Sequence, residues 1–208
     1  MVATGDVLIH QDHELVAGAR KPDGSYDFSG VLAPVAPMIE AADLAICHLE
    51  TPLAAPGGPF RGYPSFAVQP QIVTALAGAG YDVCSTASNH SLDDGFAGVV
   101  RTLDTLDAAG IAHTGTYRTV AESLQPTIVD VGGVRVGHVA GTYGLNGGGP
   151  PAGREWSVET EDVPDVHGML AAAARARAAA ASIPSTSGTS AMSTDHSRPA
   201  GGPPPLSP

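Results

Sequence analysis

The sequence predicts an α/β layered domain, and three observations support this fold class. Short apolar runs, each long enough for one buried strand, alternate with stretches of helical spacing up to about residue 168. A Gly-Gly pair then separates two further strand-like runs, which predicts a hairpin. Hydrophobic residues make up 43% of the 208 residues and charged residues 15%, so the chain can bury a core. Strands that alternate with helices and then form a hairpin are typical of layered α/β domains.

In the first half of the chain, each predicted element follows from its apolar pattern. The first strand ends at Gly5-Asp6. Residues 28–42 have helical spacing, which two prolines interrupt. Residues 43–50 (DLAICHLE) form the next predicted strand, which is buried and ends in the carboxylate of Glu50.

In the second half, glycines mark where the predicted helices end. A short helix over residues 72–79 is closed by Gly80, and a strand in residues 81–90 runs out into a polar loop. A longer amphipathic helix follows, with apolar residues from Phe96 to Leu106 on one face and Gly110 as its end. The segment IAHTG, a helical turn and the hairpin around Gly132-Gly133 complete the series.

Three segments of different composition divide the chain. Residues 1–168 carry the alternating pattern of the domain. Residues 169–181 are rich in Ala and Arg, which have high helix propensity, and predict a helix. Residues 182–208 consist mostly of Ser, Thr, Pro, Gly and Ala and hold almost no large apolar side chain, so we expect a disordered tail.

Charge and hydropathy exclude several classes of protein. A formal net charge of −11 argues against an unassisted nucleic-acid binder. No stretch of eighteen apolar residues occurs, so no transmembrane segment is expected. The N-terminus lacks the pattern of a secretory signal, which predicts a cytoplasmic chain as given. Cys47 and Cys84 both lie in apolar runs outside any CxxC motif, and we expect two buried thiols in preference to a disulfide or a metal site.

Polar side chains stand at the C-terminal ends of three predicted strands. They are Asp6 after the first strand, His48 and Glu50 after the second, and Asn89 and His90 after the third. Such ends converge on one edge of an open α/β sheet. Carboxylate and amide oxygens with imidazole nitrogen suit Mn²⁺, Zn²⁺ or Fe²⁺, and two such ions can activate water for displacement at phosphorus. The pattern therefore indicates a divalent metal site.

The order of these motifs resembles the CapA family of poly-gamma-glutamate capsule synthesis proteins. The similar segments are GDVLIH, ADLAICHLETPL, YDVCSTASNHSLDDG with the helix after it, and VGGVRVGHVAGTYGLN; together they span roughly residues 3–175. The family is similar to calcineurin-like metallophosphoesterases, which implies a four-layer α/β/β/α sandwich with a two-metal site. The resemblance implies that Asp6, Glu50 and Asn89 are metal ligands and that His90 is the catalytic histidine beside a scissile phosphate.

The sequence also departs from the family pattern. The histidine expected two residues after the first aspartate is replaced by Leu8, and His10 is a doubtful substitute. His48 stands where the family commonly has Asn, and it is expected either to orient Glu50 or to fill space. The later His-Trp-Gly and Gly-His-x-x-His segments do not occur, so we expect a partial sandwich, truncated or frameshifted at its C-terminal end, that holds its metal weakly.

Several of these polar residues also have simpler interpretations. Asp6 and Glu50 suit a turn or a solvated strand end, and Asn89 suits a helix cap. Asp93 and Asp94 are expected to stabilise the N-terminus of the following helix, and Asp93 is also expected, with His48, to support the metal ligands from outside. The remaining histidines have no partner spacing and are expected to be structural or on the surface: His13, His113, His138, His167 and His196.

Three functions agree with these features. The resemblance implies a role in poly-gamma-glutamate biosynthesis or export, with an anionic polymer or a phosphoester as substrate, membrane-bound capsule synthesis proteins as partners, and a cell-surface location. A chain this acidic repels polyglutamate unless a cation bridges the two. The alternatives are an active metal-dependent phosphoesterase and an inactive fragment. We expect negligible hydrolysis by this chain.

Overall fold

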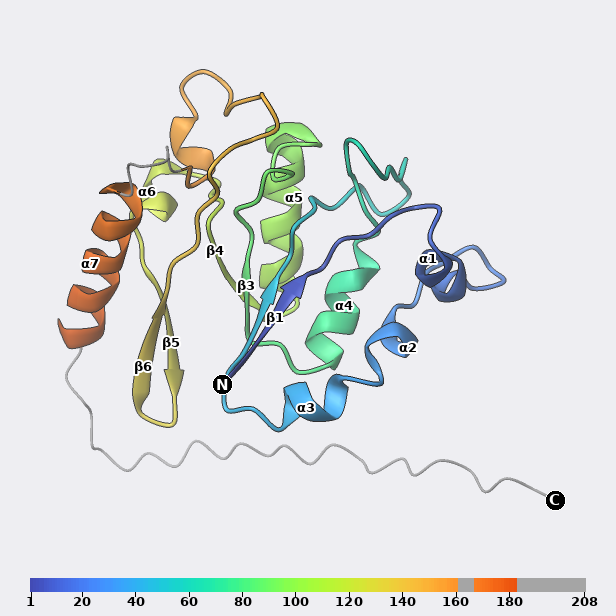
Figure 1. The fold of residues 1–208 in the computed structure, drawn as a ribbon, viewed down its shortest axis with the longest axis horizontal. Coiled ribbons are helices and arrows are strands. Elements are labelled where there is room, and N and C mark those ends of the chain that lie inside the picture. The colour runs from blue at the N-terminus through green and yellow to red at the C-terminus, as the bar shows by residue number, and fades with distance from the viewer. Residues whose placement is uncertain (161–166, 183–208) are drawn as a thin grey trace.

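Four short parallel strands form the main sheet, in the order β1-β2-β3-β4 (Figure 1). The computed structural model describes residues 1–160 and 167–182. Its parallel strands are β1 (Val2–Asp6), β2 (Ala45–His48), β3 (Val83–Ser85) and β4 (Ala112–Thr114). Each neighbouring pair runs parallel, which confirms the α/β class predicted from the alternation of strands and helices.

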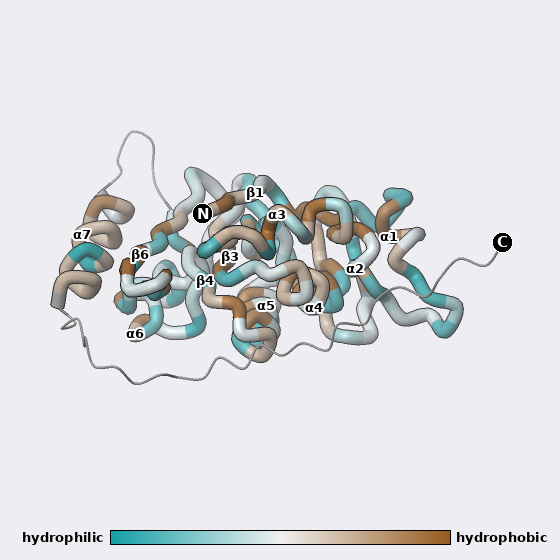
Figure 2. Tube along the Cα trace, turned by 90° about the horizontal axis from the view of Figure 1, so that it is seen from below, coloured by the Kyte–Doolittle hydropathy of each residue, from teal (hydrophilic) through white to brown (hydrophobic). Residues whose placement is uncertain are grey.

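Two helices cover one face of this sheet, α4 (Gln71–Gly78) and α5 (Gly95–Ala108) (Figures 1 and 2). Their predicted ends are confirmed, because Gly80 and Gly110 adopt φ angles of +93° and +73° just after each helix. Glycine adopts this left-handed conformation without strain. The apolar face predicted for α5 is buried through Val99, Leu103 and Leu106.

Three short helices connect β1 to β2: α1 (Glu14–Ala19), α2 (Ser29–Leu32) and α3 (Ala36–Glu40). The helical spacing predicted over residues 28–42 is divided between α2 and α3, because a proline lacks the N–H that a continuous helix needs. Helix α1 was not predicted. It begins after His13, whose ring nitrogen accepts a hydrogen bond from the backbone N–H of Leu15 at 3.3 Å.

The predicted hairpin is confirmed, and it forms a second, antiparallel sheet. After α6 (Val120–Ser123), strands β5 (Thr127–Val131) and β6 (Val134–His138) pair around Gly132-Gly133, with φ angles of +59° and +88°. Positive φ at both turn positions matches the twist of the two strands. A short 3₁₀ helix, η1 (Glu155–Ser157), follows.

Helix α7 (His167–Ser182) packs against the hairpin, at the opposite end of the molecule from α1 (Figures 1 and 2). It starts two residues before the range predicted for the alanine-rich helix. Ala172 and Ala176 are buried, and a Cβ at Gly137 would lie 2.9 Å from the Cβ of Ala176. Since β5 contacts β4, the layers run from α4 and α5 through the two sheets to α7. This arrangement is a partial α/β/β/α sandwich.

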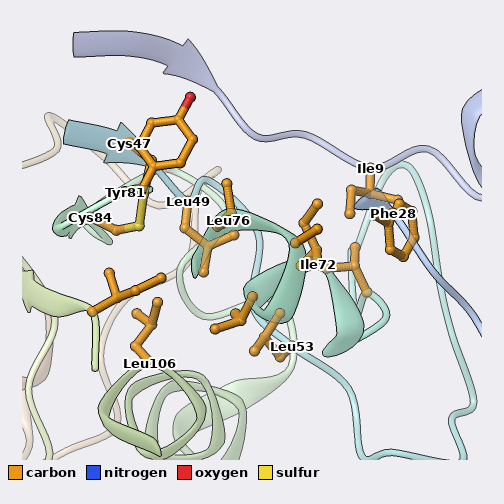
Figure 3. Packing of buried hydrophobic residues seen from close by; sticks show 14 of the residues in the cluster. Ile9, Phe28, Cys47, Leu49, Leu53, Ile72, Leu76, Tyr81, Cys84 and Leu106 are labelled. Atoms are coloured by element: carbon orange, nitrogen blue, oxygen red, sulfur yellow. A yellow bond between two sulfur atoms is a disulfide. The ribbon is translucent and has the colours of Figure 1, made fainter. Parts of the chain in front are cut away.

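Cys47 and Cys84 form a disulfide, so the prediction of two buried thiols is wrong (Figure 3). Both residues are buried as expected, but they lie directly opposite each other in β2 and β3, with their Cα atoms 4.5 Å apart. The sequence does not specify the register of two strands that are 37 residues apart, and this register decides whether the two sulfurs meet.

The main hydrophobic core lies between the parallel sheet and helices α4 and α5, and it extends to the α1–α2 region (Figure 3). The labelled members of this cluster include Leu49, Leu53, Leu76, Leu106, Ile72, Phe28 and Ile9. Leu49 is buried between two polar neighbours, His48 and Glu50. Burial of Leu49 therefore anchors the end of β2 at which the candidate site begins.

The remaining sequence expectations for this fold concern the C-terminal end and the membrane. The predicted disordered tail begins at residue 182, and residues 183–208 lie outside the described residues. Among the helices that the structure describes, none combines the length and the apolar character needed to cross a membrane.

Candidate functional site

The C-terminal ends of β1, β2 and β3 bring the predicted polar residues to one edge of the sheet. The strand register places Asp6 opposite His48, and His48 opposite Ser85. Glu50 follows two residues after the end of β2, and the Asn89-His90 pair follows β3. The convergence expected from parallel strands is therefore present, and we call this edge the strand rim.

His48 contacts Asp6. One interpretation of the sequence had His48 orient Glu50 instead. The Nδ1 atom of His48 lies 2.7 Å from Oδ1 of Asp6, and its Nε2 atom lies 3.2 Å from the backbone carbonyl oxygen of Ala87. The register between β1 and β2 places His48 beside Asp6. Both of these oxygens are hydrogen-bond acceptors, so the ring lies between them and holds the Asp6 side chain in place.

Glu50 is the electrostatic centre of the strand rim. Burial raises the pKa of its carboxyl group above the usual value of 4.5, and the negative charge of Asp6 raises it further. The charges of His90, His48 and His10 act in the opposite direction. The Oε2 atom of Glu50 is buried and, among the described residues, has no hydrogen-bond partner. A buried carboxylate oxygen without a donor is costly, and a bound cation would compensate it.

His90 is held rigidly from three directions. Its Nδ1 atom lies 2.7 Å from Oδ2 of Asp93, and that same oxygen accepts the backbone N–H of Phe66 at 2.8 Å. The rings of Phe66 and His90 meet edge to face, with centroids 4.7 Å apart. The backbone N–H of His90 donates to Oγ of Ser88 at 2.9 Å. Asp93 thus supports His90 directly, in addition to preceding helix α5.

Asp94 makes ion pairs in addition to the role predicted for it at the start of α5. It is the residue before α5, but its side chain makes no capping hydrogen bond. Its carboxylate binds Arg61, with Nη2 and Oδ1 2.6 Å apart, and also binds Arg101. Arg101 and Arg61 in turn donate to the backbone carbonyls of Leu53 and Asp93. These ion pairs tie the loop before α4 to the start of α5, behind His90.

Asn89 and His10 flank this centre. Asn89 contacts Asn146, a residue of the loop after β6 that the sequence analysis did not select as a site residue. The ring of His10 packs edge to face on Phe66 at 5.2 Å and contributes to the electrostatics of Glu50. His10 therefore lies near the site, and its role as a ligand stays a prediction.

Other histidines that were expected to be structural or on the surface have specific partners. His113 lies 3.1 Å from Asp107, and Nε2 of His138 lies 3.1 Å from Oγ of Ser85, at the end of β3. Burial lowers the pKa of His138 below its usual value. His138 therefore links the second sheet to the strand rim. The side chain of His167, at the start of α7, and all of His196 lie outside the described part of the chain.

A cavity of about 290 Å³ opens beside the strand rim, between β1 and the α1–α2 region. Asp6, His10 and His13 supply its polar wall. Its other lining residues are apolar: Val7, Leu8, Ile9, Leu15, Val16, Phe28, Val31, Leu32 and Ile72. The polar rim and an apolar recess therefore adjoin each other.

The side chains at the strand rim carry the kinds of atom that bind divalent cations, namely carboxylate and amide oxygens and imidazole nitrogens. Within residues 1–160 and 167–182, no three His, Cys, Asp or Glu side chains are placed to hold a metal ion. A metal ion at the rim therefore needs the amide oxygen of Asn89 or water in addition to Glu50 and Asp6. Oxygen donors of this kind suit Mn²⁺ and, with imidazole, Zn²⁺. The observation that favours a cation here is the buried Oε2 of Glu50, to which the described part of the chain supplies no hydrogen-bond donor.

Comparisons with known proteins find a family model and bacterial relatives that match this chain. The family model described as "Bacterial capsule synthesis protein PGA_cap" matches residues 1–188. A protein of Mycobacterium tuberculosis named as a probable polyglutamine synthesis accessory protein is 34% identical over 104 residues, which cover 48% of this chain and 27% of that protein. Two uncharacterized proteins of Sinorhizobium fredii are 28% identical over 147 residues, covering 65% of this chain and 28% of each relative. The chain thus spans little more than a quarter of the length of these curated relatives.

Proposed function

This chain belongs to the PGA_cap family of bacterial capsule synthesis proteins, and we propose that it takes part in the synthesis or export of poly-gamma-glutamate by binding the polymer through a divalent cation at the strand rim. The name of the mycobacterial relatives, probable polyglutamine synthesis accessory protein, supports an accessory role with a glutamyl polymer. The observation that carries the proposal is the buried Oε2 of Glu50, which has no hydrogen-bond partner among the described residues and is under the electrostatic influence of Asp6.

Net charge explains why a cation is needed. The chain has a formal net charge of −11, and polyglutamate carries one negative charge on each residue. Two surfaces of the same sign repel each other, and the repulsion is strongest at low ionic strength. Glu50, Asp6 and the Asn89 amide would hold a Mn²⁺ or Zn²⁺ ion, whose remaining positions accept carboxylates of the polymer. When bound, the metal supplies positive charge at a site that the protein alone makes negative.

The polymer proposal is tested by isothermal titration calorimetry with poly-gamma-glutamate, in buffer with Mn²⁺ and in buffer with a chelator. The wild-type protein is expected to bind only when Mn²⁺ is present, and Glu50→Ala is expected to lose binding. Glu14→Ala removes the same charge from an exposed position at the start of α1 and serves as the matched control. Binding that is independent of metal, or equal in Glu50→Ala and Glu14→Ala, would contradict the proposal.

One observation favours a second function, hydrolysis of a phosphoester. His90 is buried and held through Nδ1 by Asp93, an arrangement suited to an imidazole that donates a proton to a leaving group. A metal held by Glu50, Asp6 and Asn89 would supply Lewis acidity toward a phosphoester. An assay with a phosphodiester separates the two functions, because polymer binding alone releases no product.

A further inference from the structure

The side chain of Asn146 clamps Asn89 from a loop 57 residues away in sequence. Its Oδ1 atom lies 3.1 Å from Nδ2 of Asn89, and its Nδ2 atom donates to the backbone carbonyl of Asn89, also at 3.1 Å. The same Nδ2 atom lies 3.4 Å from Nδ1 of His90. One side chain therefore contacts both the main chain and the side chain of residue 89.

The backbone of Asn146 adopts an unusual conformation to make these contacts. Its φ angle is +52°, and among the described residues it is the one non-glycine residue with positive φ. The left-handed region is unfavourable for most side chains, although Asn tolerates it better than others. A turn holds the loop in place, since the N–H of Gly148 donates to the carbonyl of Leu145 at 2.8 Å. Conformations of this kind concentrate at functional sites.

The contacts of Asn146 also determine which way the Asn89 amide faces. A backbone carbonyl only accepts hydrogen bonds, so the atom of Asn146 that faces it must be the NH₂ group. The oxygen of Asn146 then faces Asn89, and Asn89 must present its own NH₂ group in return. This leaves Oδ1 of Asn89 on the other side of its amide, where it accepts a hydrogen bond from Oγ of Ser88 at 3.3 Å.

We propose that Asn146 is a positioning residue that fixes the Asn89 amide so that its oxygen, and not its nitrogen, faces a divalent cation. This inference rests on the proposed function, because it assigns Asn89 to the same cation. An amide oxygen is a ligand for hard and borderline cations, whereas the NH₂ group has no lone pair to donate. Removal of a residue that orients a metal ligand typically lowers metal affinity about 10- to 100-fold.

The test uses Asn146→Gly, because glycine adopts positive φ without strain and the variant removes only the side chain. Thr142→Val is the matched control. Thr142 lies in the same loop and donates through Oγ1 to the carbonyl of Gly144 at 3.1 Å. This hydrogen bond does not involve Asn89. Thermal unfolding checks that both variants are folded. The affinity for Mn²⁺ is then measured by calorimetry for each protein.

A change at Asn89 separates positioning from a structural role. In Asn89→Asp, both ends of the side chain are oxygens, so its orientation no longer matters for the cation. We expect Asn146→Gly to weaken Mn²⁺ binding about tenfold or more in the wild-type background and to have no further effect in the Asn89→Asp background. Thr142→Val is expected to bind like wild type. An equal loss in both backgrounds would overturn the inference.

A second readout does not depend on metal. In the metal-free, ¹⁵N-labelled protein, the two side-chain amide protons of Asn89 are expected to have well-separated chemical shifts, which collapse toward those of a free amide in Asn146→Gly but not in Thr142→Val. Unchanged Asn89 signals in Asn146→Gly would overturn the inference. Absence of Mn²⁺ binding by the wild-type protein would refute the proposed function, and the orientation of Asn89 would then be decided by these signals alone.

Discussion

Asp93 and His90 form a buried pair, with Oδ2 of the carboxylate 2.7 Å from Nδ1 of the imidazole, and the backbone N–H of Phe66 donates to the same oxygen at 2.8 Å. The two residues are three positions apart in the sequence, in the turn before α5. Asp93 therefore joins two segments, the loop before α4 and the loop after β3, in addition to fixing one ring. Its side chain and that of His90 are only 12% and 11% exposed, so water replaces neither contact easily.

We predict that Asp93→Asn destabilises the protein by about 1–3 kcal/mol, because a neutral amide oxygen accepts the hydrogen bonds of Phe66 and His90 more weakly than a charged carboxylate oxygen. Urea unfolding followed by circular dichroism measures the change. Asp12→Asn makes the same replacement at an exposed position and is expected to change stability by less than about 0.5 kcal/mol. Equal midpoints for Asp93→Asn and wild type would show that the carboxylate contributes little.

Glu50→Gln is predicted to stabilise the metal-free protein at neutral pH. The folded state raises the pKa of Glu50 through burial and the charge of Asp6, so folding favours the protonated carboxyl. Stability from this group is therefore greatest below the usual pKa of 4.5 and decreases as the pH rises through the folded value. The variant does not titrate, so its advantage over wild type should grow from pH 4 to pH 7 in the presence of a chelator. Glu14→Gln, at an exposed position, should show no such trend.

Gly137→Val is predicted to detach α7 from the hairpin. A Cβ at Gly137 would lie 2.9 Å from the Cβ of Ala176, closer than two carbon atoms pack, and the branches of valine add further overlap. Overpacking of this kind costs about 1–3 kcal/mol. Limited proteolysis within α7 should become faster in this variant, whereas Gly149→Val, at a position with open space, should match wild type.

The Cys47–Cys84 disulfide is checked by alkylation. In the purified protein, iodoacetamide is expected to modify neither cysteine in the denatured, unreduced chain and to modify both after reduction. Loss of a native disulfide costs about 2–5 kcal/mol, so the reduced protein should unfold at a lower urea concentration. Two alkylated cysteines without reductant would restore the prediction of buried thiols.

The sequence predicted most of the elements, because their boundaries depend on local chemistry. Gly80 and Gly110 end helices, and Gly132-Gly133 forms the hairpin turn. In each case the glycine adopts a positive φ angle, which is a property of the residue itself. Helix α1 was missed because its six residues carry too short an apolar pattern to distinguish it from a loop. The disulfide was missed because it depends on strand register.

The site was predictable as a set of residues and not as a set of contacts. Parallel strands bring Asp6, Glu50 and Asn89 to one edge, and this follows from topology alone. The pairing of His48 with Asp6 depends on register, and the clamp of Asn146 depends on a single positive φ angle in a loop. The three glycines that follow Asn146 were the available signal, since they mark a turn and Asn itself tolerates that conformation.

Hydrolytic turnover of bis(p-nitrophenyl) phosphate by this chain in the presence of Mn²⁺ is predicted to be negligible. Displacement at phosphorus by a two-metal site needs one cation to activate water and another to stabilise the oxygens of the transition state. The described residues offer Glu50 and Asn89 to a second cation, with no group of three His, Cys, Asp or Glu side chains to hold it. Each of the two effects contributes several kcal/mol, and about 1.36 kcal/mol corresponds to a tenfold change in rate.

His90 does not compensate for this loss. A positioned acid contributes about 10²–10⁴-fold by protonating the leaving group, but it supplies no nucleophile. The assay therefore compares wild type with His90→Ala, each with Mn²⁺ and with a chelator, after both proteins are shown to be folded. Equal background rates in all four conditions are the expected result. A rate that requires Mn²⁺ and disappears in His90→Ala would show that the strand rim completes its metal coordination with water and catalyses hydrolysis despite its few protein ligands.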